Sequence, residues 1–581
     1  MGLQVSRRGL LRSAAGSVAA GAALGGVAAP PAAADAQPAA AAPPAVVPGQ
    51  AGPLADAEYA SGFDGLRVLP DDGRYQTLSQ GFNQRFTSEP RYIQLITDDD
   101  SAVAAVREAL KHDLRPTIRG GGHCYEDFVE NTGGAILDVS TMKGIHRTED
   151  KYGRPAYCVE SGSTNWDMYC QLFRRYGVTA PGGSCYSVGV GGHICGGGYG
   201  VLSRRNGLIV DHLVQVDVVT VRGGEVEVTC AHRSDPPMSD TGQLFWAHTG
   251  GGGGNFGMVL RYYFTGALPT PPARVWLSSI AWPWAEILKK PGDFARLLKN
   301  FGEFFARHSG PDESVYQDLF SILKLTHKTN GNLALGSHWM RDETGPLDEY
   351  LAAIQEGLST EPIVLTDLAA SAGAQFQPQM SALSPVSAVS VVEKRRQMPW
   401  FQETMTVNGS GPNQRGKYKS AYHRKPFTDQ QIAALWHWLT KDVEGVDLTQ
   451  TLCQVDSYGC RTNAVAPTET AVPQRDSIMK LQYQTYWTMP AQDEAHLKFM
   501  RAFYEDVYRK TGGVPEISDA RHDRTTDGCY VNYPDIDLGV ATERAPKYPR
   551  LYYKQNYARL QQTKRLWDPR NVFHHAQSII P

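Results

Sequence analysis

Between residues 90 and 265, the hydrophobic positions change repeatedly from helical spacing to strand spacing. Val103, Val106 and Leu110 recur three and four residues apart behind Ser101, which predicts a helix with Ser101 as its N-cap. Pro116–Arg119 then predicts a short buried strand that ends at a run of glycines. This stretch therefore predicts alternating helices and strands.

Two further elements in this stretch have clear boundaries. One helix face is marked by Trp166, Tyr169, Leu172, Phe173 and Tyr176, and Gly177 is expected to end that helix. Valines alternate with polar residues from position 214 to 218, and Arg222-Gly223-Gly224 leads into a second alternating run. This pattern predicts a β-hairpin.

From about residue 270 to 520 the pattern changes to longer runs. Strand-like runs occupy 275–280, 314–325, 332–340 and 362–368. Helical runs occupy 293–307, 347–358 and 429–439. An antiparallel sheet covered by helices explains this alternation, so the chain is expected to be α+β overall. The segment from 530 to 580 is dense in aromatic residues and is expected to pack on the active site.

Length and charge limit the possible functions. A chain of 581 residues is too long for one hydrophobic core. Lys and Arg number 57 and Asp and Glu number 60. With no basic excess to attract nucleic acid or anionic lipid, we expect a small-molecule substrate and no nucleic-acid partner.

The N-terminus has the pattern of an export signal. Arg7 and Arg8 precede a small, apolar run, and Ala32-Ala33-Ala34 offers a cleavage site. A twin arginine before such a run is typical of the bacterial twin-arginine pathway, which exports folded proteins. We therefore expect a signal peptide over 1–34, a disordered Ala/Pro-rich linker over 35–53, a secreted protein and no stable membrane insertion after cleavage. The alternative, an uncleaved anchor, is disfavoured because the run is short for a span.

The nine cysteines leave their pairing open. Export permits disulfides, and Cys453 and Cys460 could close a small loop. The odd number leaves at least one thiol for other chemistry. No Cys-x-x-Cys occurs, so no zinc ribbon or other metal site is expected.

Two glycine-rich segments carry candidate nucleophiles. Arg119-Gly120-Gly121-Gly122-His123 is the first, and Gly183-Ser184-Cys185 begins the second, which continues to His193. Glycine lets the backbone approach a planar or phosphorylated ligand closely. An imidazole in one loop and a thiol in the other suggest a large cofactor held at two covalent points.

The common nucleotide motifs are absent. No G-x-G-x-x-G follows a strand and opens a helix, and no G-K-[ST] phosphate loop occurs. A third glycine run, 249–257, adds backbone N–H groups that could hold a pyrophosphate. The three glycine segments together favour a different dinucleotide fold.

These motifs, in this order, resemble the berberine bridge enzyme-like flavoproteins of the vanillyl-alcohol oxidase/p-cresol methylhydroxylase superfamily. The resemblance covers about 85–265 and 470–581 and includes the tail segments Tyr530-Val531-Asn532-Tyr533-Pro534-Asp535 and Asp568-Pro569-Arg570-Asn571-Val572-Phe573. It implies a two-part FAD-binding domain of the p-cresol methylhydroxylase type. The first part would span 54–268, the substrate domain 269–525, and the C-terminal segment that completes the FAD domain 526–581.

The resemblance also implies how FAD is held. His123 would bond the 8α-methyl group of the flavin and Cys185 its 6 position. Further cofactor contacts are implied at Arg119, Gly120, Gly121, Gly122, Gly191, Gly192, His193, Gly254, Asn255, Asn556 and Tyr557. For His193, packing beneath the ring and direct contact remain equally open.

The resemblance places the catalytic base at Tyr533, which would take the proton of a substrate hydroxyl while hydride passes to the flavin. That role needs a lowered tyrosine pKa, which the flavin and a nearby Lys or Arg could supply. Tyr530, Tyr483 and Tyr486 are second-line candidates. Some family members use a glutamate where this chain has Lys480, and this difference favours a tyrosine base.

Val188 bears on the electron acceptor. In the family, a valine three residues after the cysteine leaves the oxygen face of the flavin open, which implies an oxidase that reduces O₂ to H₂O₂. We expect a late tailoring step on a secondary metabolite. The alternatives are a carbohydrate oxidase, a flavin-containing drug-binding or resistance protein, and a secreted binding protein without activity.

Overall fold

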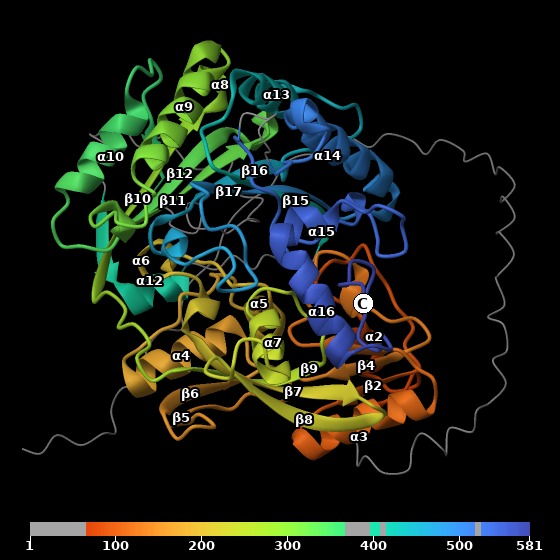
Figure 1. Cartoon of the computed structure of the whole chain (residues 1–581). Coiled ribbons are helices and arrows are strands. Elements are labelled where there is room, and N and C mark those ends of the chain that lie inside the picture. Colours follow the sequence, from red (N-terminus) through yellow and green to blue (C-terminus); the bar gives the residue numbers. More distant parts are fainter. Residues whose placement is uncertain (1–65, 366–394, 407–413, 518–523) are drawn as a thin grey trace, which may run out of the picture. The chain divides into compact units, whose positions relative to one another are not determined.

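The computed structural model describes residues 66–365, 395–406, 414–517 and 524–581 (Figure 1). The expected signal peptide, 1–34, and linker, 35–53, lie outside these residues. The described chain forms three sheets, of which the first two come from residues before 266 and the third from residues 274–487. Fold class is as expected: helices and sheets, with a large antiparallel sheet after the glycine-rich region.

The first sheet has four strands in the order β1-β2-β4-β3. These strands are β1 (Arg67–Val68), β2 (Tyr92–Leu95), β3 (Pro116–Arg119) and β4 (Ala135–Asp138). β4 pairs in parallel with both β2 and β3, and helix α3 (Asp99–Lys111) makes the connection from β2 to β3. The short helix α2 (Tyr75–Ser79) packs against β2. The strand predicted over Pro116–Arg119 is confirmed as β3, with the same first and last residues.

The predicted N-cap of α3 is wrong by three residues. Asp98, not Ser101, is the N-cap, and its carboxylate accepts from the Ser101 amide over 2.8 Å. The Ser101 hydroxyl in turn accepts from the Asp98 amide over 3.0 Å. Ser101 is thus the third helical residue of a capping box, a position that a serine three residues inside the helix can also fill.

The second sheet has five antiparallel strands in the order β5-β6-β9-β7-β8. They are β5 (Ile145–Glu149), β6 (Pro155–Glu160), β7 (Leu213–Arg222), β8 (Glu225–His232) and β9 (Met258–Thr265). The predicted hairpin is confirmed as β7 and β8, joined through Gly223 and Gly224 with φ of 61° and 92°. Such positive φ values are accessible to glycine without steric penalty.

Helices pack on and between these two sheets. Helix α4 (Asn165–Tyr176) ends at Gly177, which is left-handed with φ of 69°, as predicted. The glycine-rich region contributes the short helices α5 (Val190–Cys195) and α6 (Ser203–Asn206), followed by α7 (Asp240–Ala247). α3 contacts β3 and β4 on one side and β8 on the other, so it joins the two sheets.

The third sheet has eight strands in the order β13-β10-β12-β11-β16-β17-β15, with β14 also paired to β10. Its strands are β10 (Arg274–Pro283), β11 (Leu319–Thr326), β12 (Asn332–Trp339), β13 (Ile363–Val364), β14 (Arg396–Pro399), β15 (Arg415–His423), β16 (Leu452–Ser457) and β17 (Met479–Trp487). All of its pairings are antiparallel.

Four helices cover one face of the third sheet: α9 (Pro291–Arg307), α10 (Gly345–Gln355), α13 (Asp429–Thr440) and α14 (Asp493–Val507) (Figure 1). Their apolar stripes bury large side chains, such as Phe301 and Phe305 on α9 and Phe503 on α14. Two shorter helices, α8 (Trp284–Ile287) and α12 (Trp400–Thr406), flank β10. The expected antiparallel sheet covered by helices is confirmed.

The strand predicted over 314–325 begins later, at Leu319. The Glu313 carboxylate accepts from the amides of Val315 and Tyr316, which bends this segment into a turn before the strand. The last residues of the run predicted at 362–368 lie outside the described chain.

The C-terminal segment returns to the first part of the chain. Helices α15 (Tyr548–Tyr553) and α16 (Tyr557–Trp567) follow the third sheet, and α16 packs on α7 and β7. The fully buried Lys564 on α16 donates to the carbonyl oxygens of Asn255 and Phe573 and to the Asp568 carboxylate. The aromatic tail is therefore packed against the third glycine run.

All nine cysteines are free thiols in the structure, so the loop between Cys453 and Cys460 is not closed by a disulfide. The Cys460 thiol instead donates to the His308 carbonyl over 3.3 Å. Across the described ranges, no helix has both the length and the apolar character needed to cross a bilayer.

Candidate active site

One continuous cavity brings the predicted segments together. It is lined by the three glycine-rich segments, by the C-terminal tail and by one face of the third sheet. The predicted site residues on its wall are Gly120, Gly121, Gly122, His123, Cys185, Val188, Gly191, Gly192, His193, Gly254, Asn255, Tyr530 and Tyr533, together with the second-line Tyr486. Segments more than 400 residues apart in sequence thus share one site.

The first two glycine loops touch through their backbones. A Cβ atom on Gly121 would lie 2.4 Å from the Gly189 amide nitrogen, and one on Gly189 would lie 2.3 Å from the Gly121 nitrogen. Any side chain at either position would separate the loops. The close approach is what holds His123 and Cys185 against one cavity.

His123 is a neutral imidazole that faces the cavity. Its ring stacks on Phe82, with centroids 4.4 Å apart and planes 21° apart. Burial lowers the pKa of His123 to about 4. At neutral pH the ring nitrogen therefore keeps its lone pair, which is the form that acts as a nucleophile.

Cys185 and His193 lie in one loop arrangement. The Gly183 amide donates to His193 Nε2 over 2.9 Å, and the Asn165 side chain donates to the Cys185 carbonyl over 3.1 Å. His193 thus fixes the loop that carries the thiol, and it also lines the cavity. Burial, with Lys480 second, lowers the pKa of His193 to about 4, so this nitrogen is free to accept.

Asn255 connects the third glycine run to the tail. Its side-chain carbonyl accepts from the Ile579 amide over 2.9 Å, and its amide donates to the Gly251 carbonyl over 3.1 Å. Tyr553 donates to the same Gly251 carbonyl over 3.0 Å. The side chain of Asn255 therefore holds the shape of the wall that it lines.

Four predicted residues lie away from the cavity wall. The Arg119 guanidinium donates to the carbonyls of Leu78 and Gln80, so it holds the C-terminal end of α2 in place. The Asn556 amide donates to three carbonyls of residues 467–471, and Tyr557 accepts from the Ile580 amide. Tyr483 belongs to the opposite face of β17, where it packs against Phe503, because side chains alternate along a strand.

Tyr533 has a lysine as its polar partner. Lys480 Nζ donates to the Tyr533 hydroxyl over 3.0 Å and lies 3.3 Å from Asp456 Oδ2. Lys480 is also 4.2 Å from the centre of the Tyr533 ring. Both Lys480 and Asp456 are almost fully buried. The residue that replaces the family glutamate is thus part of the site.

The tyrosine pKa differs from the expectation. Burial raises the pKa of Tyr533 well above 10, and the Asp456 carboxylate raises it further. Tyr533 is therefore a protonated phenol at neutral pH. The expected lowering would have to come from groups that complete the site.

Three residues that the sequence analysis did not single out build the wall around Tyr533. The Tyr125 ring stacks on Tyr418, with centroids 3.6 Å apart, and lies 5.4 Å from the Tyr533 ring. Gln482 donates to the Tyr125 hydroxyl over 2.9 Å. Tyr125 follows His123 by two residues, and Gln482 follows Lys480 by two. In extended segments this spacing puts side chains on the same face, so the sequence offered this signal that they belong to the site.

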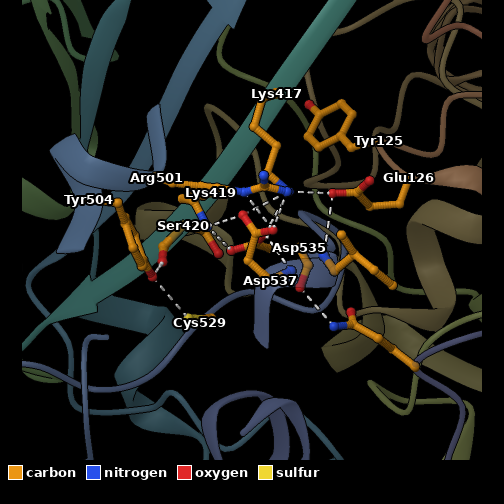
Figure 2. Close-up of polar contacts among 12 residues, drawn as sticks. Tyr125, Glu126, Lys417, Lys419, Ser420, Arg501, Tyr504, Cys529, Asp535 and Asp537 are labelled. Carbon is orange, nitrogen blue, oxygen red and sulfur yellow. Dashed lines mark hydrogen bonds and ion pairs between the residues drawn. The ribbon is translucent and has the colours of Figure 1, made fainter. Parts of the chain in front are cut away.

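Behind this wall lies a buried network of charges (Figure 2). Lys417 Nζ is 2.7 Å from both Glu126 Oε1 and Asp535 Oδ1, and Lys419 Nζ is 2.7 Å from Asp535 Oδ2 and Asp537 Oδ2. Burial alone would lower the pKa of Lys417, but Asp535, Glu126 and Asp537 together raise it above the ordinary lysine value. The network ties the loop after His123, strand β15 and the tail to one another.

Family models match two segments of the chain, one in its first half and one at its C-terminus. One described as "FAD binding domain" matches residues 90–229, and one described as "Berberine and berberine like" matches residues 529–580. Two characterised relatives match over most of their length. The aclacinomycin-N/aclacinomycin-A oxidase of Streptomyces galilaeus is 36% identical over 89% of this chain and 90% of the relative. The hexose oxidase of Chondrus crispus is 37% identical over 87% and 93%.

The chain belongs to the berberine bridge enzyme-like family of FAD-linked oxidoreductases. Solved structures agree with this assignment. The glycopeptide hexose oxidase DBV29, complexed with teicoplanin, has a TM-score of 0.76 and 36% identity, and the match covers 89% of this chain and 98% of that one. GilR, in complex with pregilvocarcin, has a TM-score of 0.77 and 35% identity over 88% and 99%. This protein is therefore an FAD-dependent oxidoreductase.

The residues of this berberine bridge enzyme-like protein fit the cofactor of its family. Along the cavity wall, Thr117 Oγ1, Ser161 Oγ and Asn165 Oδ1 are buried and have no hydrogen-bond partner among the described residues. Buried polar atoms are normally paired, so these atoms suit a polar ligand. A Cβ on Gly192 would meet nothing within 4 Å, which leaves its backbone open to the cavity.

Proposed function

We propose that this protein is a bicovalently flavinylated oxidase, in which FAD is bonded to His123 and Cys185. The support is that both nucleophiles line one cavity and that their loops touch at Gly121 and Gly189. The neutral imidazole of His123 is in its nucleophilic form. The buried atoms of Thr117, Ser161 and Asn165 would accept or donate hydrogen bonds to the same cofactor.

FAD held by His123 and Cys185 would supply the hydride acceptor for a carbon that bears a hydroxyl, or for another activated C–H, and O₂ would be the final acceptor, reduced to H₂O₂. Tyr533, ionised after its own proton has passed to solvent, receives the proton of the substrate hydroxyl at its phenolate oxygen. Lys480 holds that oxygen in place through the 3.0 Å hydrogen bond, and Asp456 holds the ammonium. The single observation that carries this assignment is the Lys480–Tyr533 hydrogen bond, whose tyrosine lines the cavity of His123 and Cys185.

The raised pKa of Tyr533 opposes ionisation to the phenolate, which is the form that can act as a base, so proton transfer needs assistance. The positive charge of Lys480 beside the phenolic oxygen favours the phenolate over the phenol. Lys480 therefore assists proton transfer through the charge that it places beside Tyr533, whereas a carboxylate base would take the proton itself. Tyr530, whose hydroxyl accepts from Asn532, lies 5.0 Å from the Tyr533 ring and contributes to the wall.

We further propose that the substrate is a late intermediate of a secondary metabolite and that the protein is exported through the twin-arginine pathway. Relatives named for aclacinomycin, pregilvocarcin and a glycopeptide support the first statement. The relative named hexose oxidase supports the runner-up, a carbohydrate oxidase. The Arg7-Arg8 motif supports export.

The test uses the protein expressed with its full leader in a bacterium that has the twin-arginine pathway. We expect a yellow protein in the culture fluid, an intact mass above that of the polypeptide by one FAD, and peroxide formed with aclacinomycin A in air. Peroxide with free hexoses and none with aclacinomycin A would favour the carbohydrate oxidase. A colourless protein, or flavin that stays reduced in air, would refute the oxidase.

A further inference from the structure

Lys324 is a buried lysine that the proposed chemistry does not use. It lies on β11, and its side chain is on the same face of the strand as Phe320 and Ile322, because side chains alternate. Both of those residues line the cavity. In the register of the sheet, Lys324 stands opposite Gln454 of β16, and Gln454 stands opposite Gln482 of β17. Both glutamines also line the cavity.

The ammonium of Lys324 is not neutralised. The residue is 6% exposed, and within the described ranges no hydrogen bond or ion pair of its Nζ is found. Burial lowers the pKa of Lys324 to about 8, and the attraction of Asp456 opposes that shift. A buried lysine is normally paired, so a lone ammonium that is still largely protonated at neutral pH calls for a ligand.

Asp456, the carboxylate of the described residues that acts on Lys324, is already engaged. Asp456 Oδ2 is 3.3 Å from Lys480 Nζ, and Asp456 Oδ1 accepts from Gln454 over 2.7 Å. Lys480 and Asp456 cancel each other, which leaves the charge of Lys324 in excess on this face of the sheet. An electrostatic excess of this kind favours an anion in the cavity.

We infer that Lys324 forms a distal anchor for the substrate and binds a carboxylate on it. The inference rests on the proposed function, since it assumes that substrate is oxidised beside Tyr533. Lys480, which reaches Tyr533, is on β17, two strands from β11. Lys480 is also offset from Lys324 by two residues along the strands, so two strand spacings of about 4.8 Å and two residue rises of about 3.4 Å separate their backbones by roughly 12 Å.

The aromatic lining of the same cavity defines the rest of the ligand. Phe320, Tyr199, Tyr418 and Tyr486 are aromatic, and Ile322 is aliphatic. A rigid aromatic body suits such a wall, because ring surfaces bury well against one another. The substrate class is therefore an alcohol on an aromatic or polycyclic framework that carries an acid group at its far end.

The experiment compares two matched probes, biphenyl-4-carboxylate and biphenyl-4-carboxamide, by isothermal titration calorimetry on the purified full-length protein. The two differ only in the charge of the terminal group. We expect the carboxylate to bind wild type more tightly than the amide. Lys324→Met should weaken carboxylate binding by about tenfold to a hundredfold, the value of a hydrogen bond to a charged group, and leave amide binding unchanged. Lys324→Arg should keep most of the affinity for the carboxylate, because the positive charge remains.

Two control variants separate this assignment from others. Lys328→Met removes a lysine four residues later, whose ammonium pairs with Asp442 over 2.6 Å outside the cavity, and should change neither affinity. Lys480→Met tests whether the carboxylate binds at the catalytic lysine instead. Loss of carboxylate binding in Lys480→Met but not in Lys324→Met would overturn the inference.

Further outcomes would also overturn the inference. Because Lys324→Met removes an unpaired buried charge, its melting temperature should equal or exceed that of wild type; a marked fall would show a structural role and overturn the inference. Equal binding of acid and amide, or binding of inorganic phosphate without binding of the biphenyl acid, would do the same. Calorimetry needs neither turnover nor flavin colour, so failure of the oxidase proposal would be seen separately, in the peroxide assay.

Discussion

Lys480 donates a hydrogen bond to the hydroxyl of Tyr533 over 3.0 Å, across 53 residues of sequence. The lysine lies on β17, next to the edge strand β15 of the third sheet, and the tyrosine lies in the C-terminal tail. Their contact joins the substrate side of the molecule to the segment that matches the berberine-like family model. The family resemblance implies a glutamate base at the position of Lys480 in some members. In this chain Lys480 instead supplies a positive charge that assists Tyr533.

Removing either member of this pair should slow flavin reduction. A general base contributes about a hundredfold to ten-thousandfold, so Tyr533→Phe should lower the reduction rate within that range and leave substrate affinity nearly unchanged. Lys480→Met should lower it less and make the rate rise with pH, since the phenol then ionises without help. Anaerobic stopped-flow absorbance measures both. An unchanged rate in Tyr533→Phe would remove it as the base.

His123 and Cys185 should hold the flavin independently. His123→Ala and Cys185→Ala should each keep one covalent link, so the acid-precipitated protein stays yellow and its intact mass still includes one FAD. The double variant should release all of its flavin on precipitation, because no nucleophile remains to hold it. If precipitated double variant kept flavin, another residue would have to be the attachment point.

Val188 should control access of O₂. Val188 lines the cavity three residues after Cys185, and a leucine there adds bulk where the acceptor must approach. Val188→Leu should slow aerobic reoxidation by on the order of tenfold, which corresponds to about 1.4 kcal/mol of barrier. Reduction by substrate in the same protein is the internal control and should be little affected. Reoxidation as fast as in wild type would dissociate Val188 from oxygen access.

Lys417 should be structurally and catalytically important. It lies next to Tyr418, and its partners Glu126 and Asp535 lie one residue after Tyr125 and two residues after Tyr533 (Figure 2). Lys417→Met removes the buried cation between two buried carboxylates and, among the described residues, leaves Glu126 with Arg85 alone and Asp535 with Lys419 alone, so unfolding free energy should fall by up to about 3–5 kcal/mol. Flavin reduction should slow as the tyrosines lose their positions.

The matched control for that variant is Arg501→Gln. Arg501 contacts Asp537 at the rim of the same network over 2.8 Å, and its side chain is 45% exposed. An exposed ion pair contributes about 0–1 kcal/mol, so this change should be nearly silent in urea unfolding. Equal losses from both variants would show that the buried position of Lys417 is not what matters.

Stability should fall in mild acid because buried histidines must stay neutral. Burial lowers the pKa of His248 to about 4, against about 6.5 in an unfolded chain. The unfolded state therefore gains the proton first, and stability that is fully present above pH 6.5 is lost as pH falls towards 4. For His248 alone the loss approaches about 3 kcal/mol.

Urea unfolding at several pH values measures this loss. His248 is 3% exposed and lies outside the cavity wall, with Nδ1 2.8 Å from the Leu244 carbonyl. His248→Gln keeps an amide donor that can serve this carbonyl and removes the titrating group, so stability should depend less steeply on pH. The same steepness in wild type and variant would assign the acid sensitivity to other groups.

The sequence determined the local structure and the cofactor chemistry. Glycine at positions 223 and 224 permits the tight turn of the β7–β8 hairpin, and Gly177 permits the left-handed end of α4, because these conformations need no distant contact. The occurrence of His123 and Cys185 in glycine-rich segments could also be found in the sequence, and the proposed bicovalent link to FAD begins from these two residue types.

Only the tertiary structure decided which side chains meet. Strand alternation and register separate Tyr483 from Lys480, although they are three residues apart, and bring Lys480 to Tyr533. Arg119 and Asn556 donate hydrogen bonds to backbone carbonyls, so these polar side chains stabilise the fold and do not line the cavity. The ammonium of Lys324 stands out only where its neighbours are known. Motifs record the residue types that a cofactor needs, whereas the pairing of buried charges depends on segments far apart in sequence.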